Sequence, residues 1–196
     1  MSEVRGKKYL LIITTLTFLA SLMLMTAPVK AEPFVSVYVY QPQGYIPGVA
    51  LGGDVIVDIY IDASELAVNS AEGIAGWGMD VEVDSSVLTP LGVDGAKSGY
   101  FLEDFRSTYY RFGYSTNLMQ PAISDGYMDE IAEMIMPTPP GGAGGTGKLV
   151  TLYFTSQSEI AYSKIDLIDA TYMTTDGVWH PVDEVIDGHY NAPPTP

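Results

Sequence analysis

The sequence lacks cysteine altogether and is poor in histidine and in basic residues. Without cysteine, the chain has no disulfide framework, no thiol nucleophile and no thiolate ligand for zinc or an iron–sulfur cluster. The two histidines, His180 and His189, leave little for a histidine-based metal or acid–base site. Nine basic residues stand against 24 acidic ones, and phosphate recognition needs clustered Lys and Arg. We therefore expect neither an enzyme nor a nucleic-acid-binding protein.

The first 31 residues contain the three parts of a secretory signal peptide. A short basic stretch ending at Lys8 precedes an apolar run over 9–25, and small residues follow up to Ala31. We expect residues 1–31 to be a signal peptide and the protein to be secreted, extracellular and associated with the cell surface. The apolar run is close to the lower limit for crossing a bilayer, so an uncleaved N-terminal anchor is the alternative. A membrane is involved only in that case.

The part of the chain that would be exported is strongly acidic. Loss of residues 1–31 removes four basic residues and one acidic residue and changes the net charge from −15 to −18. Such a charge keeps a protein soluble and attracts cations. Because 47% of the residues are apolar and 17% are charged, we expect a folded domain over 32–190. A Pro-rich tail is expected over 191–196.

Alternation of apolar and polar residues is the main pattern after residue 32. Along 54–62 the odd-numbered positions carry Val or Ile, while Asp58 and Asp62 stand between them, as in a strand with one buried face. Asp-Gly pairs, which tolerate the positive φ of tight turns, separate several such stretches. The expected strands are 34–40, 54–62, 77–84, 88–93, 109–115, 126–136, 148–154, 164–173 and 184–190. About nine short strands predict an all-β fold, a jelly-roll β-sandwich.

Two stretches do not follow this pattern simply. The apolar residues of 128–136 also fit one face of a helix, but we favour a strand because a sandwich offers no obvious place for one short helix. The Gly- and Pro-rich stretch 137–147 is expected to be a flexible hairpin loop. Gly142–Lys148 matches most of a phosphate-binding loop, but Leu149 stands where Mg²⁺ binding needs Ser or Thr. We therefore do not interpret this loop as a nucleotide site.

Three strand motifs, in order, resemble those of the cohesin domain family. Gly53–Ile61 is similar to the family's Gly-Asp-Thr-Val-Thr-Val-Pro-Val strand. Trp77–Asp84, followed by Ser-Ser-Val-Leu, resembles a strand ending in Tyr-Asp that leads into Pro-Ser-Val-Leu. Gly147–Phe154 looks like Gly-x-Leu-Ala-Thr-Leu-Thr-Phe. Cohesins are β-sandwich modules related to cellulose-binding modules and are best known from bacterial scaffoldins.

The sequence differs from the family pattern at several places, and the resemblance also implies a function. Val83 stands where the family usually has Tyr, and Ser85 stands where it has Pro. The Tyr-rich insertion between Leu91 and Gly147 is long, and that region of cohesins helps to form the partner-facing side. The resemblance implies a non-catalytic, extracellular recognition module of polysaccharide-degrading or cell-surface assemblies, with a dockerin-like partner.

Tyrosine is unusually frequent, with 14 residues, and several are crowded between positions 100 and 127. Aromatic rings can stack on sugars or anchor a protein interface. We hypothesise that Tyr100, Tyr109 and Tyr127 contribute to an exposed patch that binds a partner or a glycan. The alternative is that alternate aromatics of this stretch, Tyr110, Phe112 and Tyr114, fill the core. Trp77 and Trp179 are both expected in the core.

Acidic residues are the remaining candidates for a cofactor site. Two groups are close in sequence: Asp80, Glu82 and Asp84, and Asp125, Asp129 and Glu130. Neither follows the Asp-x-Asp-x-Asp-Gly order of a helical calcium loop. We interpret them as the solvated side of a sheet and expect no cofactor and no catalytic residue, with Ca²⁺ binding as the alternative.

The sequence therefore favours a module that binds a protein partner, either a dockerin-like domain or another copy of itself, or a polysaccharide. A second hypothesis is a structural subunit of a surface layer or of a filament in which subunits exchange a strand. A third is a secreted glycoside hydrolase, although no pair of carboxylates stands out for that chemistry.

Overall fold

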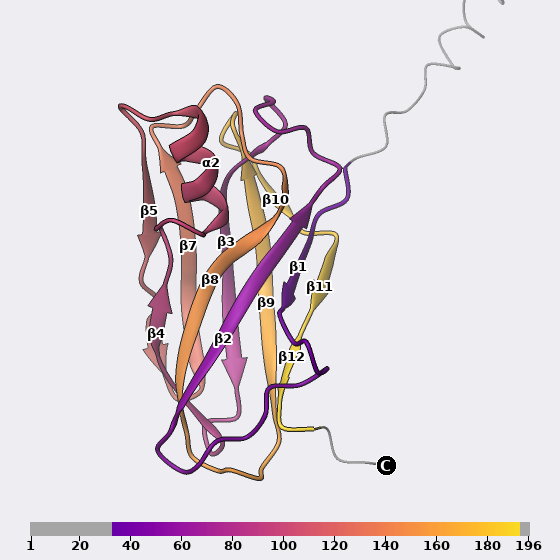
Figure 1. Cartoon of the computed structure of the whole chain (residues 1–196), viewed down its shortest axis with the longest axis vertical. Coiled ribbons are helices and arrows are strands. Elements are labelled where there is room, and N and C mark those ends of the chain that lie inside the picture. Colours follow the sequence, from indigo (N-terminus) through magenta and orange to yellow (C-terminus); the bar gives the residue numbers. More distant parts are fainter. Residues whose placement is uncertain (1–32, 193–196) are drawn as a thin grey trace, which may run out of the picture. The chain divides into compact units, whose positions relative to one another are not determined.

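Two β-sheets packed face to face form the described part of the protein (Figure 1). The computed structural model describes residues 33–192, so the expected signal peptide at 1–31 and most of the expected tail at 191–196 lie outside the described residues. Between residues 33 and 192 there are twelve strands and one helix. The expected all-β sandwich is confirmed, with more strands than the nine expected.

The first sheet has five strands and contains the N-terminal strand. Its order is β11 (Glu184–Ile186), β1 (Ser36–Val39), β2 (Asp54–Ala63), β8 (Gly145–Ser156) and β4 (Leu88–Asp94). Strand β1 pairs with β11 in parallel and with β2 in antiparallel orientation. The β2–β8 pairing runs the whole length of β2, with one register shift between Ile59 and Tyr60.

The second sheet has seven strands and carries the helix at one end. Five of them run in the order β10 (Trp179–Pro181), β9 (Ser163–Thr174), β3 (Ile74–Val83), β7 (Tyr127–Met136) and β5 (Ser115–Met119). The other two strands are β12 (Gly188–Tyr190), which pairs with β9, and β6 (Ala122–Ser124), which pairs with β7. Helix α2 (Phe101–Tyr109) lies at the upper end of the sandwich in Figure 1.

The core lies between the sheets and consists of the apolar positions of the alternating strands. Trp77 is 1% exposed, which confirms its expected place in the core. The largest fully buried side chains also include Phe154, Ile59, Ile61, Ile74, Leu88, Met128, Ile131, Ile135 and Leu149. Each such side chain contributes about 1.5 to 3 kcal/mol relative to an exposed one, so burial of the alternating apolar residues is the main attraction between the sheets.

Helix α2 was not expected from the sequence. It buries Phe101, Leu102 and Phe105, a spacing that places all three on one side of a helix. Glu103 and Asp104 stand in its first turn, where carboxylates interact favourably with the helix dipole. The helical pattern was therefore present in the sequence, although the only element expected next to it was the strand over 109–115.

Other expectations in this region were partly wrong. The strand expected over 109–115 does not form, because these residues complete α2 and turn into β5. Phe112 in that turn is 92% exposed, and Trp179 at the edge of the second sheet is 44% exposed, so neither fills the core. The segment 128–136 is strand, as expected.

The Gly-rich stretch 137–147 is not a hairpin loop. It crosses from one sheet to the other, and its last residues belong to β8, whose pairing with β2 includes Gly145. The backbone at Gly142 lies against the backbone at Gly73, and Gly142 N–H donates a hydrogen bond to the Ser70 carbonyl (2.8 Å). The glycines are needed here because two backbones approach without room for a side chain.

The close backbone approach predicts a marked effect of one methyl group. A Cβ at Gly142 would lie 2.2 Å from the carbonyl carbon and oxygen of Gly73, so Gly142→Ala should lower the free energy of unfolding by about 2 to 3 kcal/mol. Gly78→Ala is the matched control, because its Cβ would have its nearest neighbour at 3.6 Å. Urea unfolding measures both, and equal midpoints for the two variants would contradict this account.

Candidate functional site

Tyr100 is buried and is not part of an exposed patch, which corrects the expectation from the sequence. It is 4% exposed, and its hydroxyl lies 2.8 Å from Thr151 Oγ1. Thr151 donates its hydroxyl hydrogen to Asp58 Oδ1 (2.6 Å), so Tyr100 is the donor to Thr151. The Lys148 ammonium lies 4.5 Å from the centre of the Tyr100 ring. Tyr100 thus supports the outer side of the five-stranded sheet.

The other two candidate tyrosines lie at opposite ends of the sandwich. Tyr109 is 48% exposed at the end of α2, where its ring packs against Phe105 with 4.9 Å between centroids. Tyr127 begins β7 at the end away from α2 (Figure 1) and pairs with Glu82. The three tyrosines are close in sequence but do not come together in one patch. Whether Tyr109 or Tyr127 binds a ligand stays a prediction.

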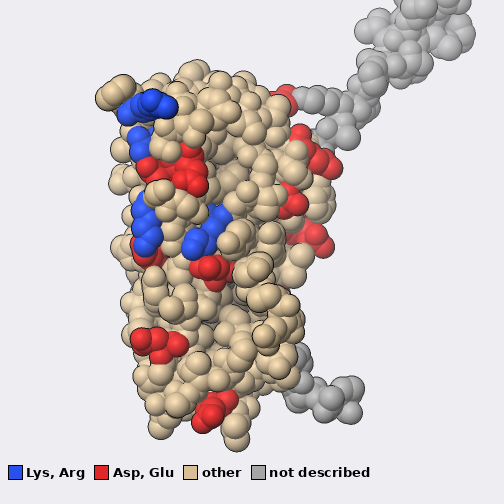
Figure 2. Space-filling view, viewed as in Figure 1, with Lys and Arg blue, Asp and Glu red and all other residues tan. Residues whose placement is uncertain are grey.

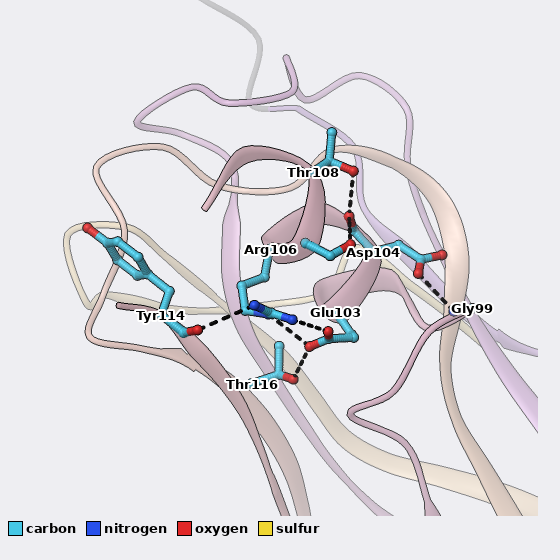
Figure 3. Close-up of polar contacts among 8 residues, drawn as sticks. Gly99, Glu103, Asp104, Arg106, Thr108, Tyr114 and Thr116 are labelled. Atoms are coloured by element: carbon cyan, nitrogen blue, oxygen red, sulfur yellow. Dashed lines mark hydrogen bonds and ion pairs between the residues drawn. The ribbon is translucent and has the colours of Figure 1, made fainter. Parts of the chain in front are cut away.

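A polar network fixes α2 to the second sheet (Figure 3). Glu103 binds Arg106 through an ion pair in which Nε donates at 3.0 Å, and it also accepts the hydroxyl of Thr116 in β5 (2.7 Å). Arg106 further donates to the Tyr114 carbonyl (3.4 Å). The hydrogen bond from Arg106 holds the pKa of Glu103 below its usual value. The charges under the helix are therefore paired, and the helix is held in one position.

The outer side of the seven-stranded sheet carries glycines and apolar side chains. Because Trp77 points into the core, its neighbours Gly76 and Gly78 face outward. Gly76 lies opposite Met134 of β7, and Gly78 lies opposite Ala132. We call this surface the glycine–methionine face; it consists of Gly76, Gly78, Met119, Ala132, Met134, Met173 and Trp179.

The register explains how this face is assembled from five strands. Met119 of β5 lies opposite Ala132, and on the other side Met173 of β9 lies opposite both Gly76 and Trp179 of β10. Met119 is 47% exposed and Trp179 is 44% exposed. Met173 is 7% exposed, and its Cε lies 3.2 Å from where a Cβ of Gly76 would stand, so Met173 covers Gly76. The partly exposed small residues Gly78 and Ala132 therefore form a strip between the exposed side chains of Met119 and Trp179.

One end of this face is acidic. Tyr127 donates a hydrogen bond to Asp80 Oδ2 (2.7 Å), and the Glu130 N–H donates to Asp80 Oδ1 (2.9 Å). The hydrogen bond to Asp80 raises the pKa of Tyr127 to about 12, with smaller contributions from the nearby Asp129 and Asp169 carboxylates. Several negative charges thus surround one exposed end of the sheet.

A carboxyl group lies in the core directly beneath the glycine–methionine face. Glu133 is 1% exposed and accepts one hydrogen bond, from Trp77 Nε1 (3.2 Å), whereas its Oε1 has no partner among the described residues. Burial raises the pKa of Glu133 to about 7, and the charge of Glu103 acts in the same direction. Ala132 and Met134, the two neighbours of Glu133 in β7, point to the outer face.

The described residues contain no cluster of three or more acidic or histidine side chains that could hold a metal ion. Asp80 is instead engaged by Tyr127 and by the backbone of Glu130. Between residues 33 and 192, no helix is long and apolar enough to cross a membrane.

The sequence did not identify the components of the glycine–methionine face. Trp179 was expected in the core, and its exposure depends on the position of β10 at the edge of the sheet. Gly76 and Gly78 at alternate positions of a strand were a usable signal, because glycine in a strand marks a site of close approach. The methionines gave no signal of their own.

No family model and no curated protein sequence matches the chain. The solved structures give a consistent result. The fold is similar to the second type II cohesin module of the adaptor ScaA scaffoldin of Acetivibrio cellulolyticus, with a TM-score of 0.59 and 12% identity over 83% of this chain and 92% of that one. The fold is thus a cohesin-type β-sandwich.

Two further structures extend this likeness. The sixth cohesin of Acetivibrio cellulolyticus scaffoldin B, solved in complex with a Cel5 dockerin mutant, matches with a TM-score of 0.51 and 16% identity over 81% of this chain and 98% of that one. A non-cellulosomal cohesin of the archaeon Archaeoglobus fulgidus matches with a TM-score of 0.50 and 14% identity over 80% of this chain and 89% of that one. The resemblance stated from the sequence motifs is confirmed at the level of the fold.

The burial of Glu133 predicts a specific pH dependence of stability. The folded protein binds this proton more tightly than the unfolded chain, so stability is highest below pH 4.5 for this group and falls as the pH rises to about 7. Glu133→Gln keeps an acceptor for Trp77 and removes the charge. It should raise the free energy of unfolding by up to about 3 kcal/mol at pH 8 and by little at pH 4.

Denaturant unfolding of both proteins between pH 4 and pH 8 measures this difference. Glu82→Gln, an equal change of charge at an exposed position of β3, is the control and should give a difference that does not grow with pH in this way. A constant difference between the Glu133→Gln variant and the unmodified protein across the range would show that Glu133 does not titrate in the core.

Proposed function

We propose that the protein is a non-catalytic recognition module that binds a dockerin-type protein partner through the glycine–methionine face. The observation that carries the proposal is the strip of small residues at Gly78 and Ala132, with the exposed side chains of Met119 and Trp179 on its two sides. A sheet face that only contacts water usually carries polar side chains.

The chemistry of this face suits a protein surface. Glycine lets a partner's side chains approach the sheet backbone, while methionine adapts its shape to an apolar surface at low cost. Trp179 and Met119 stand at opposite edges of the strip and enlarge the contact area. An apolar centre with a polar rim is the usual composition of a specific protein interface.

The acidic end of the face indicates the charge that the partner carries at one end of its docking surface. Asp80, Asp129 and Asp169 surround Tyr127, and charged rims mainly influence the rate of association and the choice of partner. We therefore propose a partner with an apolar docking surface and Lys or Arg residues at one end of it.

The comparisons support a dockerin-type partner. Solved structures with this fold include a scaffoldin B cohesin of Acetivibrio cellulolyticus with a Cel5 dockerin and a Clostridium thermocellum cohesin with a dockerin. The strands β5 and β7 fall within 91–147, the region that the family resemblance associates with the partner-facing side. An extracellular, cell-surface role within a polysaccharide-degrading or cell-surface assembly is part of the same proposal.

The pairing of β1 supports recognition over the filament hypothesis. A filament subunit would leave its N-terminal strand free for a neighbour, whereas Ser36–Val39 pairs with β2 on one side and with β11 on the other. The glycoside hydrolase hypothesis has less support, because Glu133 is enclosed in the core and the nearby Glu103 is paired with Arg106.

Introducing a long charged side chain on the face should abolish partner binding. The purified protein is tested against a panel of recombinant dockerin modules that includes the Cel5 dockerin, by isothermal titration calorimetry. We expect at least one dockerin to bind, and Ala132→Arg to weaken that binding by at least 100-fold, because Ala132 lies at the centre of the strip.

Ala67→Arg, the same change in an exposed turn, serves as the control and should leave the affinity unchanged. Thermal unfolding of both variants checks that the fold is retained. Absence of binding to every dockerin, or equal affinities for the two variants, would contradict the proposal.

A further inference from the structure

The outer side of the five-stranded sheet carries a second set of tyrosines, remote in sequence from the first. Tyr38 of β1 lies directly opposite Tyr60 of β2, with ring centroids 5.9 Å apart and an interplanar angle of 24°. Tyr40 follows β1, and its ring lies 5.2 Å from that of Tyr60. Tyr40 remains 50% exposed. We call these three side chains the tyrosine ladder.

A groove of about 250 Å³ adjoins the tyrosine ladder. Ile56 and Asp58 line it from β2, and Tyr40, Pro42, Gln43 and Tyr45 line it from the segment that follows β1. One part of the lining is aromatic or aliphatic, with Ile56 58% exposed, and another part offers a carboxylate and an amide.

The loop that closes the groove is held in place by the C-terminal strand. The Ile46 N–H donates to the His189 carbonyl (2.7 Å), and the Asn191 N–H donates to the Ile46 carbonyl (2.8 Å). The Gln41 side chain donates to the same His189 carbonyl (2.9 Å). The groove therefore exists before any ligand arrives, which lowers the entropic cost of binding.

Asp58 is positioned to accept hydrogen bonds from a ligand. Its Oδ1 accepts from Thr151 (2.6 Å) and from Lys148 (3.4 Å). Both of these donors, the ones that Asp58 has among residues 33–192, use Oδ1 rather than Oδ2. Tyr100 in turn donates to Thr151, so the carboxylate is fixed by a chain of hydrogen bonds.

We propose that the groove and the tyrosine ladder form a binding site for a neutral polysaccharide, in which Tyr40 contacts the apolar face of a sugar ring and Asp58 accepts its hydroxyl hydrogens. Sugars combine apolar C–H faces with hydroxyl donors, and the lining supplies an aromatic ring beside a carboxylate and an amide. Ligand sites in general combine apolar walls with a few placed polar groups.

Charge and size select this ligand over others. Asp54, Asp58 and Asp62 all come from β2 on this side, so an anionic glycan would be repelled. Figure 2 looks onto this side and shows wide areas without charged residues, with basic residues gathered toward α2 and β8 and acidic residues both beside them and toward the margins. A stable protein interface needs about 800 Å² on each partner, whereas the groove is a narrow feature beside three rings.

The site can be tested with defined glycans. The full-length protein is run by native electrophoresis in gels that contain barley β-glucan, xylan or glucomannan, and is mixed with insoluble cellulose and chitin in pull-down assays. Polygalacturonate serves as the anionic probe. We expect at least one neutral glycan to retard or capture the protein, and polygalacturonate to have no effect.

Two variants assign binding to the groove. Tyr40→Ala removes the exposed ring, and Ile56→Lys places a cation in the groove; each should weaken glycan binding at least tenfold. Phe112→Ala is the control, because Phe112 is an exposed aromatic residue in the turn after α2 and does not line the groove. Ala132→Arg, which tests the proposed protein partner, should leave glycan binding unchanged, so the two proposals fail independently.

Three results would overturn the proposal. The first is failure of all five neutral glycans to bind, and the second is binding that Tyr40→Ala and Ile56→Lys leave intact in variants with unchanged thermal unfolding. The third is loss of dockerin binding in these variants without any glycan binding, which would make this side a protein interface instead.

Discussion

The alternation of side chains along each strand determines which residues enter the core and which form the two outer sides of this molecule. Each residue of a strand faces either the other sheet or the exterior, so burying one set commits the other set to the surface. In β3 the residues Trp77, Met79 and Val81 enter the core, which places Gly78 and Asp80 between them on the outer side. In β2 the core takes the Val and Ile residues at odd positions and leaves Asp58 and Tyr60 outside. The two outer sides therefore consist of residues that the core did not require, and their compositions differ sharply.

Glu133 is the exception to this division, because it is a titratable side chain that points into the core. It occupies a core position of β7 with one hydrogen bond for two carboxylate oxygens. Burying a charge without full pairing is costly, so the core tolerates this group best when it is neutral. Its neighbours Ala132 and Met134 form the centre of the glycine–methionine face. A charge that appears at Glu133 is therefore created directly beneath the surface that we propose for partner binding.

Much of the fold could be predicted from the sequence because the long strands carry their pattern locally. Strands β2, β3 and β8 each show alternation over seven or more residues, and the three family motifs fall on them. The short edge strands β10, β11 and β12 have three residues each, and their pairing depends on partners far along the chain. Helix α2 was missed although Phe101 and Phe105 have helical spacing: no element was expected over 101–108, and the strand expected over 109–115 began at the last residue of the helix.

The candidate sites were harder to predict because closeness in sequence is a poor guide to closeness in a sandwich. Tyr100, Tyr109 and Tyr127 lie within 28 positions of one another, yet one is buried and the other two lie at opposite ends. Tyr38 and Tyr60 are 22 positions apart and stack, because β1 and β2 pair in a register that places them opposite each other. The tyrosine ladder could be found only from the pairing of β1 with β2, and not from the positions of the tyrosines in the sequence.

The two proposed binding surfaces lie on opposite sides of the sandwich, and packed sheets are about 10 Å apart. A ligand on one side thus makes no contact with a ligand on the other, and both can bind at once. Coupling between them needs an element that touches both sides. The segment of α2 does so, because Tyr100 at its start hydrogen-bonds to Thr151 of β8, while Glu103 in its first turn hydrogen-bonds to Thr116 of β5. Strand β12 does so as well, because it pairs with β9 and its His189 carbonyl accepts hydrogen bonds from Ile46 and Gln41 of the loop that closes the groove. Any dependence of one affinity on the other would pass through such elements, and the ion pair between Glu103 and Arg106 holds α2 in one position, which favours independent binding.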